Sequence, residues 1–179
     1  GLLKLSDFDL NEVDVVEVTD AVMAEMTSTV TPQGILALCV LPRREVSELS
    51  TFSSKKSLRI IYLHEIQDPG NAGTVIRSAD AAGFDAVVFS NESVDVFNPK
   101  TVRATVGSLW HIPVVSDVDI NEFIAGATAN GVSLFALTGD GNESFDSNFV
   151  AKSSTTPSAW IFGNEARGLP ELPSQITTV

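Results

Sequence analysis

Two short segments of this sequence combine residues that could bind an anionic ligand. The first, residues 68–79, opens with a turn-forming Asp-Pro-Gly and places Asn71 six positions before Arg77. An arginine guanidinium can hold a phosphate oxygen through two hydrogen bonds, and an asparagine side chain can cap a helix or contact a ligand. From the spacing alone, the alternative is a capped helix whose Arg77 pairs with Asp80 or Glu65.

The second segment, residues 161–170 (IFGNEARGLP), directly follows an apolar run. Its two glycines, Gly163 and Gly168, bracket Asn164 and Glu165, which makes a loop whose backbone amides can face a ligand. An ordinary surface turn is the alternative, but such a composition is unusual for a turn that comes directly after a buried strand.

The elements that must position these segments alternate between strands and helices. Strands separated by helices of about a dozen residues indicate βαβ units, and therefore an α/β fold with a mostly parallel sheet flanked by helices. Ligands in such sheets bind beyond the carboxyl ends of the strands, so the loops that follow strands are where chemistry is expected. The predicted strands are 58–63, 86–90, 111–115, 132–138 and 159–162, and the predicted helices are 74–82, 99–109 and 119–130.

The N-terminal part predicts a separate α/β piece. Within it, Thr19–Met26 predicts a short helix capped by Thr19 or Asp20, and residues 35–41 predict an apolar strand. A polar, serine-rich stretch that follows predicts a linker. We therefore expect residues 1–50 to be the tail of a small α/β domain plus a linker, and residues 51–179 to form a second domain.

Composition excludes several classes of protein. No apolar run reaches the length of about 18 residues that a membrane span needs. The single cysteine, Cys39, excludes an internal disulfide framework and a cysteine-rich zinc site, and it fits a reducing cytoplasm. The net charge of −12 argues against nucleic-acid binding by bulk attraction, but residues 43–103 hold eight basic and eight acidic residues, so a polyanion could be held there locally.

Together and in this order, the two segments resemble motifs one and two of the SpoU (TrmH-type) RNA ribose methyltransferases of the SPOUT superfamily. The resemblance extends from about residue 58 to residue 179. It implies a SPOUT-type fold with a C-terminal trefoil knot, S-adenosyl-L-methionine as cofactor, no metal, and a homodimer. The implied reaction is methyl transfer to a ribose 2′-hydroxyl of RNA, with ribosomal RNA favoured over transfer RNA because residues 31–34 (TPQG) suggest a preceding RNA-binding domain.

The family's functional residues can be carried over position by position. Asn71 and Arg77 match motif one and, with Glu165 of motif two, are the implied catalytic residues beside the reacting ribose. Gly107 matches a small residue for which we expect a packing role. The family's third motif, which completes the pocket and the knot, is not reached before Val179, so we expect a chain truncated before that motif. The implied cofactor contacts are Thr138, Gly139, Gly163, Asn164, Glu165 and Gly168.

Two other functions remain open from the sequence. One is a non-catalytic RNA-binding or assembly protein with the same fold, and the other is an α/β enzyme that acts on a small acidic or nucleotide substrate. The role of Glu165 is also open, because a carboxylate in this loop could either fix the loop or accept a proton. For Arg77 we expect a phosphate clamp, since arginine stays protonated in proteins and is therefore a poor base.

Overall fold

The computed structural model describes residues 13–41, 44, 57–153 and 155–179. The chain divides into two compact units, residues 1–41 and 42–179. None of the described helices is both long and apolar enough to cross a lipid bilayer.

In the first unit, α1 (Asp20–Met26) is the one regular element within residues 13–41. Of the two candidate caps, Thr19 is the N-cap, because the Thr19 hydroxyl accepts a hydrogen bond from the Val22 amide at 3.4 Å. The strand predicted over residues 35–41 is wrong. A β-strand needs a hydrogen-bonded neighbour, and residues 13–41 supply none, so most of the large apolar side chains of this stretch stay exposed, namely Leu36, Leu38, Val40 and Leu41.

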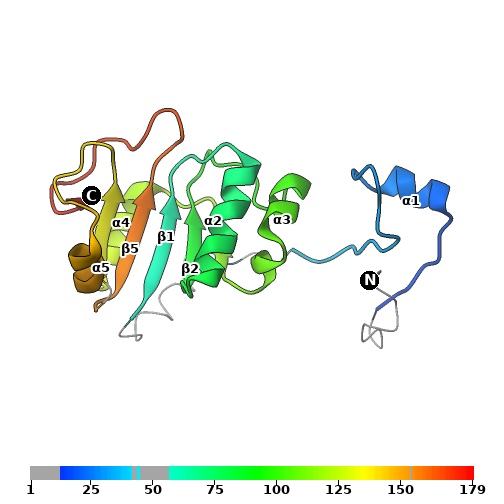
Figure 1. Ribbon diagram of the computed structural model, residues 1–179, viewed down its shortest axis with the longest axis horizontal. Helices are drawn as coiled ribbons and strands as arrows, with labels where there is room; N and C mark the ends of the chain where they lie inside the picture. Colours follow the sequence, from blue (N-terminus) through cyan, green and yellow to red (C-terminus); the bar gives the residue numbers. More distant parts are fainter. Residues whose placement is uncertain (1–12, 42–43, 45–56, 154) are drawn as a thin grey trace. The chain divides into compact units, whose positions relative to one another are not determined.

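The second unit is built on a six-stranded sheet in which every pair of neighbouring strands is parallel (Figure 1). The order is β3-β2-β1-β5-β4-β6. The structure confirms the predicted α/β class. It shortens the predicted strand at 111–115 to two residues, and it adds β6, which is too short to leave a pattern in the sequence. The strands are β1 (Arg59–Leu63), β2 (Ala86–Phe89), β3 (Val114–Val115), β4 (Ser133–Leu137), β5 (Ser158–Phe162) and β6 (Thr177–Thr178).

Helices cover both faces of this sheet (Figure 1). Successive side chains of β1 alternate between two apolar cores, as the two-residue period of a strand requires. Tyr62 packs with α4 (Ile120–Ala129), where its ring stacks on Phe123 at 4.5 Å between centroids. Ile61 belongs instead to the core under α2 (Pro69–Ala81) and α3 (Pro99–Thr105). A further short helix, α5 (Ser147–Ser153), was not predicted.

Helix α2 begins at Pro69, five residues earlier than predicted. Asp68 is its N-cap, because Asp68 Oδ1 accepts a hydrogen bond from the Asn71 amide at 2.8 Å, and proline suits the first helical position. The side chain of Asn71 is therefore not needed as a cap. Asn71 lies in the first turn of the helix, and Arg77 lies further along it.

Helix α3 ends at Thr105, four residues earlier than predicted. Val106 and Gly107 both adopt left-handed backbone conformations, with φ of 52° and 96°, and a 3₁₀ turn (Ser108–Trp110) follows. The packing role expected of Gly107 is wrong, because a Cβ there would meet nothing within 4 Å. The glycine is needed for its positive φ instead.

Candidate active site

The loops that follow β1 and β5 meet at the centre of the sheet. These strands are neighbours, with Leu63 opposite Phe162, and the His64 amide donates to the Phe162 carbonyl at 2.8 Å just beyond them. In the sheet, β2 and β3 lie on one side of β1, and β5, β4 and β6 lie on its other side. Such a reversal of strand order is where ligands bind in parallel α/β sheets.

The two predicted motifs come together at this point through the carboxylate of Glu165. Glu165 Oε1 accepts hydrogen bonds from Asn71 Nδ2 at 3.2 Å and from the Asp68 amide at 3.4 Å, and Oε2 accepts one from the Gln67 amide at 3.4 Å. Two of the donors are backbone amides just before α2, where amides point outward without helical partners. The structure thus brings Asn71 and Glu165 together, as the resemblance implies.

These contacts set the charge of Glu165. Burial by itself would raise the pKa of this carboxyl, but hydrogen bonds from its own backbone amide, from the Asn71 side chain and from the Gln67 and Asp68 amides outweigh it, so the pKa is lowered. A carboxylate with a lowered pKa is a weaker base. Three hydrogen bonds from the segment at the start of α2 thus hold the Glu165 carboxylate against that segment.

Arg77 is exposed on α2, and within the described part of the chain its side chain has no hydrogen bond or ion pair. Both partners that a purely structural role would give it are engaged elsewhere. Asp80 contacts His111 at 3.3 Å, and Glu65 pairs with Arg167 at 2.7 Å. The structural alternative for Arg77 is therefore wrong in the form stated, and its guanidinium is available to a ligand.

A cavity of about 810 Å³ opens beyond the carboxyl ends of β4 and β5. Its wall contains every predicted cofactor residue except Glu165, namely Thr138, Gly139, Gly163, Asn164 and Gly168. A larger cavity of about 920 Å³, beside β4 and α5, contains none of the predicted residues.

The wall of the smaller cavity has features of a ligand site. The hydroxyl of Thr138 is buried and has no hydrogen-bond partner within the described residues, which is a costly state unless a ligand or water satisfies it. Gly139 has nothing within 4 Å of the position a Cβ would take. At Gly163 a Cβ would lie 2.4 Å from the Gly168 carbonyl carbon, so the loop closes only over a glycine.

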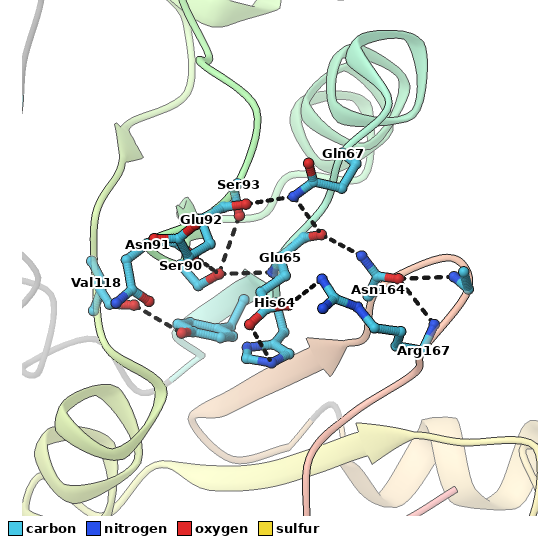
Figure 2. A network of polar contacts seen from close by, with 12 residues as sticks. His64, Glu65, Gln67, Ser90, Asn91, Glu92, Ser93, Val118, Asn164 and Arg167 are labelled. Carbon is cyan, nitrogen blue, oxygen red and sulfur yellow. Dashed lines mark hydrogen bonds and ion pairs between the residues drawn. The ribbon is translucent and has the colours of Figure 1, made fainter.

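Asn164 holds the loop of residues 163–168 in shape (Figure 2). Its Oδ1 accepts hydrogen bonds from the Ala166 and Arg167 amides, both at 2.9 Å, and its Nδ2 donates to the Glu65 carbonyl at 2.7 Å. Asn164 is 8% exposed, so its amide serves the loop itself. Sequence reasoning missed the part that Glu65, Gln67 and Arg167 play here, and no spacing pattern marks them.

Comparisons with known proteins identify the family of this chain. The profile of the SpoU rRNA Methylase family matches residues 58–177. The 23S rRNA (guanosine(2553)-2'-O)-methyltransferase RlmP of Bacillus subtilis is 35% identical over 144 residues, which cover 80% of this chain and 53% of that protein. The 23S rRNA (uridine(2479)-2'-O)-methyltransferase of Streptomyces viridochromogenes is 28% identical over 77% of this chain and 47% of that protein.

Solved structures give the same result. The SpoU methyltransferase AviRb from Streptomyces viridochromogenes, in complex with the cofactor AdoMet, superposes with a TM-score of 0.62 at 27% identity, over 73% of this chain and 51% of that one. The AdoMet-bound rRNA methyltransferase from Sinorhizobium meliloti gives 0.55 at 34% identity, over 65% of this chain and 43% of that one. The chain spans about half the length of the relatives it matches. By the extent of the family match, and by the meeting of its two motifs at the centre of the sheet, the chain belongs to the SpoU rRNA methylase family.

Proposed function

We propose that this protein transfers a methyl group from S-adenosyl-L-methionine to a ribose 2′-hydroxyl of ribosomal RNA. Family membership and the named activities of the two 23S rRNA methyltransferases support the reaction and the substrate class. The observation that carries the proposal is the contact of Asn71 with Glu165, because it joins the substrate-side motif to the loop beside the cavity.

The residues of the cavity fit S-adenosyl-L-methionine. The cofactor carries hydroxyl, amino and carboxylate groups, so it could satisfy the buried hydroxyl of Thr138, and the open face of Gly139 leaves room for it. When bound, it supplies a methyl group that is already activated by a positively charged sulfur. The residues proposed to hold it are Thr138, Gly139, Gly163 and Gly168, which line the cavity. Asn164 and Glu165 would act on the cofactor through the shape and position of their loop.

The chain's own groups align the ribose and stabilise charge. Arg77 would hold a phosphate adjacent to the target nucleotide and stabilise negative charge as it grows on the hydroxyl oxygen. Asn71, whose side chain Glu165 already fixes in place, would orient the ribose. Glu165, with its lowered pKa, stays ionised and keeps the loop against the start of α2.

Three features complete the proposal. Residues 1–50 would be the tail of an RNA-binding domain with a linker, ahead of a methyltransferase domain over residues 51–179. The active protein would be a cytoplasmic homodimer, for which the expected light-scattering mass is that of two chains, and a monomeric mass would refute it. The trefoil knot implied by the resemblance stays a prediction.

The direct test is to incubate the full-length protein with radiolabelled S-adenosyl-L-methionine and with unmodified ribosomal RNA or transfer RNA, and then to identify the labelled nucleoside. We expect a 2′-O-methylated nucleoside from ribosomal RNA. Label only in transfer RNA would keep the reaction and overturn the substrate class. Absence of both methyl transfer and cofactor binding in calorimetry would favour a non-catalytic RNA-binding protein instead.

A further inference from the structure

We propose that Glu65 and Arg167 are positioning residues that hold the loop of residues 163–168 in its cofactor-binding shape. This inference rests on the proposed function, because it assigns the pair to the same cavity. Neither residue belongs to the set that the sequence predicted.

The two side chains join the loop after β1 to the loop after β5 (Figure 2). Arg167 Nη2 lies 2.7 Å from Glu65 Oε2, across a separation of 102 positions in the chain. The Glu65 carbonyl also accepts the hydrogen bond from Asn164 Nδ2 at 2.7 Å. Glu65 therefore contacts the loop at two places, once through its side chain and once through its backbone.

Glu65 is itself held in an uncommon conformation. Its φ is 51°, in the left-handed region that side-chain-bearing residues adopt chiefly where their surroundings fix them. The fixing contact is the hydrogen bond from the Glu65 amide to Ser90 Oγ at 2.7 Å, and Ser90 is 2% exposed at the end of β2. The carboxylate of Glu65 thus projects from an anchored backbone and presents a defined partner to Arg167.

The ion pair is poorly placed to contribute much to stability. The Arg167 side chain is 71% exposed and that of Glu65 is 27% exposed, and pairs of this kind contribute little to folding because water and salt screen them. The position of the ion pair matters more for cofactor binding than for stability, because Arg167 also lines the proposed cofactor cavity. Fixing Arg167 fixes one wall of that cavity, and small displacements of such a wall can cost a large factor in binding or rate.

The variant Glu65→Gln separates these roles. It keeps the hydrogen bonds of the residue 65 backbone with Ser90, Asn164 and Gln67. It removes the charge that faces Arg167 and that also lies 3.7 Å from His64 Nε2. In the protein without cofactor, we expect trypsin to cleave after Arg167 several-fold faster in Glu65→Gln, because a loop that opens more often is cut more often. By calorimetry, we expect the Kd for S-adenosyl-L-methionine to rise about 10-fold, with kcat at saturating cofactor changed less than about 3-fold.

A second exposed contact between a carboxylate and a nitrogen-bearing side chain provides a control. Asp80 and His111 lie 3.3 Å apart with side-chain exposures of 28% and 72%, nearly those of Glu65 and Arg167, but neither lines the cavity. We expect Asp80→Asn to leave both cofactor affinity and cleavage after Arg167 unchanged. An equal loss of affinity in Asp80→Asn would overturn the inference, since the loss of any exposed carboxylate contact would then have the same effect.

A double-mutant cycle tests whether the two residues act as a pair. Arg167→Gln should raise the Kd as much as Glu65→Gln does, and the double variant should be no worse than either single variant. Independent effects that multiply in the double variant, or a Glu65→Gln protein that binds cofactor like the unaltered one, would refute the pairing. Binding of S-adenosyl-L-methionine to the unaltered protein is measured before any variant is compared. If the unaltered protein does not bind it, the proposed function is refuted independently of the ion pair.

Discussion

Asn71 and Glu165 are 94 positions apart in the chain, yet the Asn71 side-chain amide donates a hydrogen bond to the Glu165 carboxylate at 3.2 Å. The contact exists because β1 and β5 are neighbours at the point where the strand order reverses, so the loops after these two strands share one edge of the sheet. The topology, rather than either motif alone, creates the site. We therefore expect a substitution in either motif to impair the site that both motifs form.

Replacing Glu165 with glutamine should weaken the junction between the two loops. The variant keeps one acceptor oxygen, but it loses the charge and places an amide donor among three donors, namely Asn71 Nδ2 and the Gln67 and Asp68 amides. We expect methyl transfer to fall about 10- to 100-fold, in the range typical of misplaced catalytic groups. Single-turnover assays with labelled cofactor would measure the rate of methyl transfer. Full activity would contradict the role of Glu165 in joining the two loops.

The pH dependence of stability follows from the lowered pKa of Glu165. A carboxyl whose pKa is lower in the folded protein stabilises it above the ordinary glutamate pKa, and this contribution is lost as the pH falls through the folded-state pKa. The difference in free energy of unfolding between the unaltered protein and Glu165→Gln should be constant from about pH 7 to about pH 5.5 and should shrink at lower pH. Urea denaturation at several pH values tests this, and a difference that grows on acidification would contradict it.

Arg77→Ala should abolish methyl transfer and leave cofactor binding nearly intact. Arg77 is exposed on α2, does not line the cavity, and has no ion pair within the described residues, so its loss removes no structural contact seen there. The control is Lys100→Ala, which removes an exposed positive charge from the neighbouring helix α3 and should retain activity. Calorimetry and transfer assays on both variants separate binding from chemistry, and unchanged turnover by Arg77→Ala would exclude the proposed role.

Much of this arrangement is predictable from the sequence, because it depends on local patterns. Apolar runs predict the strands and the α/β class, and Thr19 caps α1 as a short polar side chain does. The two motifs predict that Asn71 and Glu165 belong to one site. The start of α2 is missed because Asp68 caps the helix while Pro69 and Gly70, read as a turn, form its first residues.

The remaining features depend on contacts between distant segments. The pairing of Glu65 with Arg167 needs β1 beside β5, and a strand order cannot be read from the spacing of strands along the chain. The strand predicted over residues 35–41 fails because its apolar pattern has no neighbouring strand to pair with within residues 13–41. Periodicity predicts which residues suit an element, whereas pairing depends on what the fold places beside it.

Two glycines of the cavity should respond differently to alanine. At Gly163 a Cβ would lie 2.4 Å from the Gly168 backbone, so Gly163→Ala should displace the loop and lower the melting temperature together with cofactor affinity. At Gly139 a Cβ would meet nothing within 4 Å, so Gly139→Ala should fold normally and lose affinity only if the cofactor occupies that space. Thermal melts and calorimetry on both variants distinguish the cases, and normal cofactor binding by Gly139→Ala would remove this residue from the proposed site.

The contact between α2 and α3 offers a test of the scaffold behind Asn71 and Arg77. A Cβ on Gly73 would lie 2.4 Å from the Ala104 Cβ and 2.9 Å from the Thr101 carbonyl oxygen, so the helices could accept it only by separating. We expect Gly73→Ala to destabilise the protein by about 1–3 kcal/mol, as overpacked cores do.

Gly126 in the middle of α4 is the matched control, because a Cβ there would meet nothing within 4 Å. Gly126→Ala should stabilise the protein by about 0.5–1 kcal/mol, since alanine favours the helix more than glycine does. Denaturation in urea gives both free energies. Because α2 carries Asn71 and Arg77, Gly73→Ala should also reduce methyl transfer, and a variant that lost stability but kept full activity would show that the catalytic geometry tolerates movement of this helix.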